Sequence, residues 1–142
     1  MRNINGIAEV YDPIRKKYLL LTPEEWVRQN CVQYFTNFLK IPSYSINLEY
    51  GLKLNGLSKR IDILVRNSQG KSILLVECKA ENVPITQEVI YQASRYNLVS
   101  KAPLLMVTNG KTSFYFKINF EKNDVENLSE LPKWNELKEI VL

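Results

Sequence analysis

The chain of 142 residues contains no histidine, and this absence excludes more chemistry than any other feature of its composition. Without histidine the protein cannot use a serine–histidine–aspartate or cysteine–histidine nucleophile, a histidine-based nuclease site or a zinc site with imidazole ligands. Acid–base chemistry must come from carboxylates, lysine, tyrosine or a metal-bound water. Cys31 and Cys78 are too few for a disulfide framework and have no zinc spacing, so each is expected to be a small buried residue.

Long hydrophobic runs are absent as well. No apolar stretch approaches the roughly 20 residues needed to cross a bilayer, and residues 1–6 lack the hydrophobic part of a signal peptide. These features predict a soluble cytoplasmic protein without membrane contact. The net charge of +4 is compatible with a polyanionic partner but does not require one.

The order of predicted elements is helix, three strands, helix and two strands. This order indicates an α/β domain with a central mixed β-sheet flanked by helices. A single domain is expected over 1–142, because the length and the 45% of hydrophobic residues suit one core. Residues 1–21 are predicted to form a lead-in hairpin, 22–118 the core, and 119–142 an acidic tail with a last helix around 134–141.

Two helices have clear start signals. Thr22 is a predicted N-cap, followed by a proline at the first helical position and by Glu25 where a capping box requires an acidic residue. Apolar residues then recur at helical spacing until Pro42 ends the pattern. Thr86 is predicted to cap a second helix that reaches about Ser100.

The predicted strands are joined by short turns. Residues 44–54 are apolar at every even position, which predicts a strand with one buried face. Asn55-Gly56 predicts the turn into the next strand, and Asn109-Gly110 predicts the turn between the last two. Thr108-Asn109-Gly110 is interpreted as a turn signal without a catalytic role.

Charged residues within these apolar strands are the strongest functional signal. Asp62 lies inside one run, and Glu77 and Lys79 end the next. Glu77 and Lys79 share one face because side chains alternate along a strand. The two carboxylates and the backbone carbonyl of Cys78 would supply hard oxygen ligands for Mg²⁺, which lowers the pKa of a bound water and neutralises charge on a phosphate, while Lys79 would orient the water or the phosphate oxygens. The alternative is an ordinary ion pair at a strand edge, with Asp62 in solvent.

These residues resemble the PD-(D/E)xK nuclease motif, and the chain more narrowly resembles the nuclease domain at the N-terminus of type I restriction enzyme R subunits. The similarity spans about 21–116. The matching segments are 22–29 (TPEEWVRQ), 60–63 (RIDI), 76–79 (VECK), Gln92 with Tyr96-Asn97, and 108–110 (TNG).

The resemblance implies a restriction-endonuclease-like fold and a metal-dependent endodeoxyribonuclease, which hydrolyses DNA phosphodiester bonds with Mg²⁺ or, in its place, Mn²⁺. The expected partners are DNA and a separate motor or restriction-modification subunit, because the 142 residues include no translocase motor. Two alternatives stay open: a non-catalytic DNA-binding or assembly module on the nuclease scaffold, and a junction or repair nuclease.

The resemblance also implies roles for residues outside the central motif. In the family an acidic residue of the first helix completes the metal site, so Glu25 is a candidate metal ligand, with Glu24 as the fallback; its position in a capping box explains Glu25 equally well. In related nucleases a glutamine–tyrosine pair lies near the scissile phosphate.

Two overlapping pairs in the second predicted helix have the spacing of that glutamine–tyrosine pair. Gln92 and Tyr96 border the helix face that should pack on the sheet, and they are predicted to orient the phosphate. Gln87 and Tyr91 lie well round from this face and are predicted to be on the surface. Contacts to the phosphate backbone are predicted for a set of basic residues, although each of them alone is more typical of a solvated surface: Lys53, Lys59, Arg60, Arg95 and Lys111.

Overall fold

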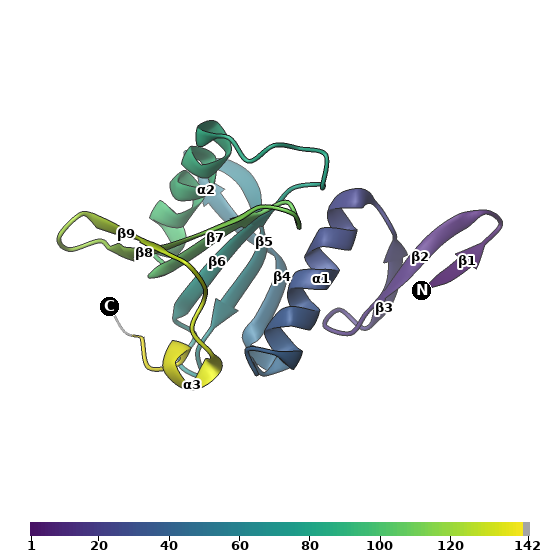
Figure 1. Ribbon diagram of the computed structural model, residues 1–142, viewed down its shortest axis with the longest axis horizontal. Coiled ribbons are helices and arrows are strands. Elements are labelled where there is room, and N and C mark those ends of the chain that lie inside the picture. The colour runs from purple at the N-terminus through teal and green to yellow at the C-terminus, as the bar shows by residue number, and fades with distance from the viewer. Residues whose placement is uncertain (141–142) are drawn as a thin grey trace.

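A mixed six-stranded sheet forms the centre of the structure, a computed structural model that describes residues 1–140 (Figure 1). All neighbouring strands are antiparallel except one parallel pair in the middle of the sheet, which confirms the predicted mixed α/β fold. The strands lie side by side in chain order: β4 (Ile46–Leu54), β5 (Leu57–Arg66), β6 (Ser72–Cys78), β7 (Leu104–Thr108), β8 (Ser113–Asn119) and β9 (Asp124–Leu128).

Helices α1 (Pro23–Asn37) and α2 (Gln87–Ser100) pack on opposite faces of this sheet (Figure 1). Val27 and Phe35 of α1 belong to one buried cluster, and Ala93 of α2 belongs to the other. Burial of these apolar side chains supplies most of the stabilisation of the layered structure. Both helices begin where the sequence predicts. Cys31 and Cys78 are buried free thiols, which is also as predicted.

The strand predicted over residues 44–54 does not have one buried face. Residues 43–45 form a short 3-10 helix, and β4 begins only at Ile46. Glu49 has a positive φ of 51°, and its pair with Asp62 is missing from an otherwise continuous register. Ile46 therefore packs with α1 whereas Tyr50 packs with α2. Asp62 of β5 lies opposite this interruption.

The C-terminal region differs from the predicted acidic tail in one respect. Residues 124–128 form β9, which the sequence does not reveal because four of its five residues are exposed and no apolar alternation marks them. The helix α3 (Trp134–Leu137) is shorter than predicted, and residue 141 of that prediction lies outside the described residues. Within residues 1–140, no helix is both long and apolar enough to span a membrane.

The N-terminal residues form a second, three-stranded antiparallel sheet instead of a hairpin, and it lies beyond α1 (Figure 1). Asp12, at the end of its middle strand, is buried and accepts hydrogen bonds from the backbone N–H groups of Ile14 (2.8 Å) and Arg15 (3.0 Å). Burial would raise the pKa of Asp12, but these bonds and the Arg15 guanidinium lower it overall. Asp12 thereby fixes the turn that carries Arg15. The strands are β1 (Arg2–Ile4), β2 (Ile7–Asp12) and β3 (Lys17–Leu20).

Replacement of Thr22 by alanine is expected to cost about 1 kcal/mol of unfolding free energy, because the Thr22 hydroxyl caps α1. Its oxygen accepts from the Glu25 N–H at 3.0 Å. Thr86→Ala is the matched control, since the Thr86 oxygen accepts from the Val89 N–H of α2 at a longer 3.4 Å and should contribute less. Urea unfolding of both variants measures the two losses of unfolding free energy. An equal or larger loss for Thr86→Ala than for Thr22→Ala would contradict the expectation.

Candidate active site

Asp62 and Glu77 lie next to each other on neighbouring strands. Ile63 of β5 pairs with Val76 of β6, so the two carboxylates occupy the next position along both strands. The Asp62 Oδ2 atom accepts a hydrogen bond from the Cys78 N–H at 2.8 Å. Glu77 Oε1 lies 3.9 Å from Lys79 Nζ. The structure therefore brings together the three residues of the predicted motif.

Glu77 is a poorly compensated carboxylate. Its Oε2 atom is buried without a hydrogen-bond partner among the described residues. Burial, and then the negative charge of Asp62, raise the pKa of Glu77 to about 8, although Lys79 acts in the opposite direction. A carboxylate in this state binds either a proton or a cation at neutral pH.

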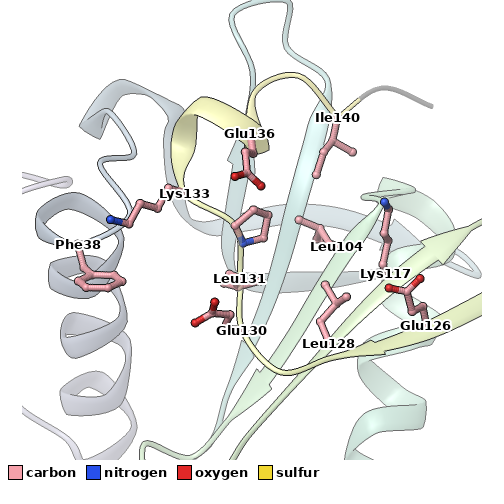
Figure 2. A pocket seen from close by; sticks show the side chains of 11 residues that line it. Phe38, Leu104, Lys117, Glu126, Leu128, Glu130, Leu131, Lys133, Glu136 and Ile140 are labelled. Carbon is pink, nitrogen blue, oxygen red and sulfur yellow. The ribbon is translucent and has the colours of Figure 1, made fainter.

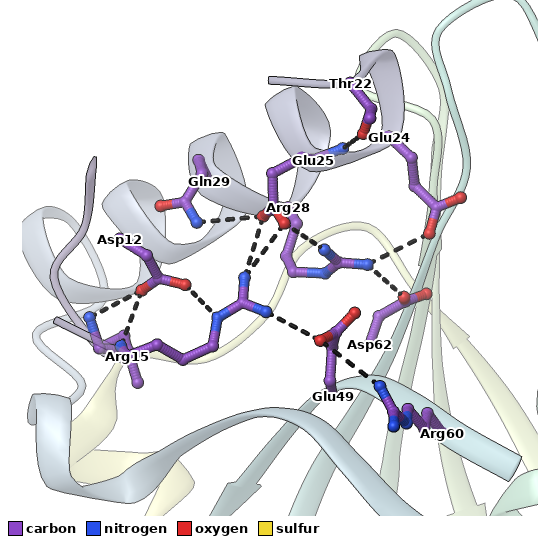
Figure 3. A network of polar contacts seen from close by, with 11 residues as sticks. Asp12, Arg15, Thr22, Glu24, Glu25, Arg28, Gln29, Glu49, Arg60 and Asp62 are labelled. Atoms are coloured by element: carbon purple, nitrogen blue, oxygen red, sulfur yellow. Dashed lines mark hydrogen bonds and ion pairs between the residues drawn. The ribbon is translucent and has the colours of Figure 1, made fainter. Parts of the chain in front are cut away.

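Arg28 is a residue of the candidate site that sequence reasoning missed. Its guanidinium donates to Glu25 Oε1 (2.7 Å), Asp62 Oδ1 (2.9 Å) and Glu24 Oε1 (3.2 Å) (Figure 3). Burial alone would lower the pKa of Arg28, but the bond to Asp62 and the surrounding carboxylates raise it, so the side chain is a fixed cation. The signal was present, because Arg28 follows two glutamates at helical spacing and adjoins the buried face of α1.

Glu25 does not point at the Asp62–Glu77 pair. Its carboxylate accepts from Arg15 Nη2 (3.1 and 3.2 Å), Arg28 and Gln29 Nε2 (3.1 Å) (Figure 3). Nor does it complete a capping box, since the Thr22 N–H donates to the Leu20 carbonyl. The geometry does not favour Glu25 as a metal ligand.

The fallback residue Glu24 is nearer to the pair. Burial, and then the negative charge of Asp62, raise the pKa of Glu24, and the two carboxylates share Arg28. Within residues 1–140, no three acidic or cysteine side chains converge as a ready-made metal site. The guanidinium of Arg28 lies between Glu24, Glu25 and Asp62, which explains why the acidic groups do not converge further.

Gln92 and Tyr96 form a pair of their own. Gln92 Nε2 donates to Tyr96 Oη at 3.1 Å, and in the described part of the chain neither side chain bonds to Asp62, Glu77 or Lys79. Tyr96 is half-buried against the cluster under α2, whereas Tyr91 is 68% exposed. Their role near a phosphate stays a prediction, as does that of the Cys78 carbonyl.

The predicted basic residues are distributed over several surfaces. Lys53 and Arg60 lie on the β4–β5 hairpin and are exposed, whereas Lys59 is half-buried on the opposite face of the same hairpin. Arg95 of α2 and Lys111 of the β7–β8 turn are exposed. Only the hairpin residues continue the strand that carries Asp62.

The loop predicted to be a turn at Thr108-Asn109-Gly110 forms hydrogen bonds with Lys79 and with the segment that follows it. The Lys79 N–H donates to the Thr108 carbonyl at 2.9 Å. Asn109 Nδ2 donates to the Val83 carbonyl at 2.8 Å and thereby fixes the segment that follows Lys79. A Cβ at Gly110, whose φ is +89°, would meet Val27 of α1 at 3.4 Å. The loop is a structural support for Lys79.

A hollow of about 590 Å³ lies between the end of α1, the β7–β9 strands and α3 (Figure 2). It is lined by residues such as Phe38, Leu104, Leu128 and Lys133, and it contains none of the predicted site residues. A smaller hollow of about 370 Å³ is lined by Arg15, Thr22, Glu24, Glu25, Arg28 and Glu49, and thus adjoins the carboxylates.

Comparisons with known proteins concern the family and the fold of the chain. The family model for the type I restriction enzyme R protein N terminus matches residues 23–132. A fragment described as an HsdR subunit of a type I restriction enzyme from Vibrio vulnificus YJ016 is 26% identical with a TM-score of 0.53, over 78% of this chain and 24% of that one. This chain thus spans about a quarter of the length of the Vibrio fragment.

A second structure is similar in fold. A protein described as a nuclease of the DUF820 family from Anabaena variabilis ATCC 29413 is 15% identical with a TM-score of 0.52, over 100% of this chain and 89% of that one. At this identity the likeness concerns the fold alone, which is restriction-endonuclease-like. No curated protein matches the chain significantly.

Proposed function

Because this chain belongs to the family of type I restriction enzyme R protein N-termini, we propose that it is a nuclease domain that hydrolyses DNA phosphodiester bonds with Mg²⁺. The observation that carries the proposal is the pair formed by Asp62 and Glu77 on adjacent strands, with Lys79 beside it. The family and the fold support a nuclease-like domain, and the positions of these side chains support the proposed chemistry.

The residues present fit a magnesium ion. All candidate ligands are hard oxygens, and among residues 1–140 Glu77 Oε2 is a buried acceptor without a hydrogen-bond partner. The surrounding network is also short of positive charge. With every group ionised, six carboxylates face four cations, which leaves a formal charge of −2, opposite to that of a divalent cation: Asp12, Glu24, Glu25, Glu49, Asp62 and Glu77 against Arg15, Arg28, Arg60 and Lys79.

Asp62 and Glu77 would hold the ion, with Glu24 as a third carboxylate in preference to Glu25. Two carboxylates suffice, because Mg²⁺ in phosphoryl-transfer sites usually keeps several waters and contacts substrate phosphates. When bound, Mg²⁺ lowers the pKa of a coordinated water and neutralises charge on the phosphate. Mn²⁺ is expected to substitute for it.

The side chains of the protein orient the reacting groups. Lys79 lies beside Glu77 and can hold the attacking water or a phosphate oxygen. Asp62 is fixed by the Cys78 N–H and by Arg28, so its orientation does not depend on the substrate. Lys53 and Arg60 extend from the same hairpin and suit contacts to the DNA backbone, which need no sequence readout.

Cleavage of supercoiled, linear and branched DNA with Mg²⁺, Mn²⁺ or EDTA tests the proposal. Lys79→Met is expected to lower the cleavage rate by about 100-fold, because it removes a positioned charge at the phosphate. Lys122→Met, which changes an exposed lysine of the β8–β9 turn, should leave the rate unchanged. DNA binding without cleavage under either ion would instead indicate a non-catalytic module, and strong preference for branched DNA would indicate a junction nuclease.

We also propose that the domain acts within a type I restriction complex, as the name of its family and of the Vibrio protein suggest. In such a complex another domain or a separate motor subunit would supply DNA translocation.

A further inference from the structure

A continuous chain of ion pairs runs from the N-terminal sheet to the candidate active site (Figure 3). It begins at Asp12, passes through Arg15, Glu25 and Arg28, and ends at Asp62. We propose that Arg15 is a positioning residue for Asp62, acting through Glu25 and Arg28. This inference rests on the proposed nuclease function for its catalytic meaning, although the coupling itself can be measured without cleavage.

Arg15 contacts three carboxylates from three different parts of the fold. Its Nε donates to Asp12 in the same turn, its Nη1 to Glu49 of β4 (2.9 Å), and its Nη2 to both oxygens of Glu25 on α1 (3.1 and 3.2 Å). A planar guanidinium can bridge three acceptors at once, which an ammonium cannot do with fixed geometry. Arg15 therefore ties the N-terminal sheet to the first turn of α1 and to the central sheet.

Glu25 links the two guanidiniums. Its side chain is 9% exposed, so its charge needs nearby cations, and Arg15 and Arg28 both supply them. Arg28 in turn has only two terminal nitrogens, one bonded to Glu25 and the other shared between Asp62 and Glu24. The orientation of Arg28 thus depends on how strongly Glu25 attracts it.

Loss of Arg15 should change how Arg28 is shared between Glu25 and Asp62. Without its cation, Glu25 would keep Arg28 and Gln29 as partners and would attract Arg28 more strongly. Asp62 Oδ1 would then lose part of its contact with Arg28, and the Cys78 N–H would be the better-fixed of the two partners of the carboxylate. A small displacement of a metal-binding carboxylate is enough to slow a reaction that depends on alignment.

The position of Arg15 makes this link unexpected. The family match begins at residue 23, so Arg15 and the whole N-terminal sheet lie outside it. The N-terminal sheet would be part of the catalytic architecture of this chain, in that the turn between β2 and β3 supplies a cation to the first helix.

A double-mutant cycle tests the coupling without metal. Urea unfolding in EDTA is measured for the wild type, Arg15→Met, Asp62→Asn and the double variant. Arg15 and Asp62 do not touch, so independent sites would give additive effects. The proposal expects a coupling of about fivefold in the unfolding equilibrium constant, and additivity within about twofold would overturn it.

Cleavage kinetics test the catalytic part. Arg15→Met should lower kcat about tenfold while KM for DNA stays within about twofold, and Arg15→Lys should restore only part of the rate. Lys17→Met, an exposed change in the same hairpin, is the control and should have no effect. Unchanged kcat in a folded Arg15→Met protein, or full rescue by lysine, would overturn the proposal.

If Arg15→Met does not fold, Arg15→Lys takes its place in both the unfolding and the cleavage experiments. If the wild type cuts no DNA, the proposed function fails, and the cycle still decides the coupling.

Discussion

The Glu77→Gln variant is expected to be more stable than the wild type at pH 8.5 in EDTA, and to have lost its cleavage activity. Burial and the neighbouring Asp62 raise the pKa of Glu77 from 4.5 to about 8. Between these two values the folded protein binds a proton that the unfolded chain does not. The free energy of unfolding of the wild type should therefore fall as pH rises through this window. Above pH 8 the whole destabilising contribution of ionised Glu77 is present.

Glutamine has nearly the shape of glutamate but carries no charge, so the variant avoids the cost of a buried negative charge at position 77. The expected gain at pH 8.5 is about 2–4 kcal/mol of unfolding free energy, and it should nearly disappear at about pH 4.5, where Glu77 is protonated in the folded protein and half protonated in the unfolded chain. Urea unfolding at pH 4.5, 6.5 and 8.5 measures it. Glu81→Gln, at an exposed carboxylate of the following loop, should show no such gain. A wild type whose stability does not fall over this pH range would contradict the expectation.

The same variant should cut DNA at least about 100-fold more slowly with Mg²⁺, since it removes one of the two proposed ligands. Opposite changes in stability and activity are typical of a site held in an unfavourable charge state for function. An increase in stability together with full activity would show that Glu77 is buried for structural reasons and that the ion is held elsewhere.

The sequence predicts the central architecture because its signals are local. Thr22 and Thr86 mark the starts of both long helices, and Asn55-Gly56 and Asn109-Gly110 mark turns where the structure has them. The prediction fails where tertiary contacts override the pattern. One positive φ at Glu49 divides an apparently regular strand between two faces, and no period-2 pattern can reveal that.

The candidate site shows a similar division. The sequence reveals Asp62, Glu77 and Lys79 by their positions in apolar strands, because burial of an unpaired charge there is costly. Arg28 could not be assigned in this way, since arginine in an amphipathic helix is usually exposed. Its partner Asp62 lies 34 positions away along the chain, and only the packing of α1 on the sheet brings them together.

Replacement of Arg28 by methionine is expected to be the most destabilising single change in the candidate site. Arg28 is 5% exposed and pairs with buried Glu25 and Asp62. Methionine retains most of the apolar volume but leaves these carboxylates without their shared cation. Removal of one partner from a buried ion pair typically costs 3–5 kcal/mol, so a loss of about this size is expected in urea unfolding at pH 7 in EDTA.

Arg60→Met is the matched control, because Arg60 is 74% exposed and its nearest carboxylate oxygen, on Glu49, lies 3.9 Å away. The unfolding free energy of Arg60→Met should lie within about 0.5 kcal/mol of that of the wild type. Addition of Mg²⁺ should then restore more stability to Arg28→Met than it adds to the wild type, since the ion would supply the cation that Asp62 has lost. Equal stabilisation of both proteins by Mg²⁺ would mean that the ion does not bind near Asp62, whereas a larger effect in the variant would place the ion near the carboxylates that pair with Arg28.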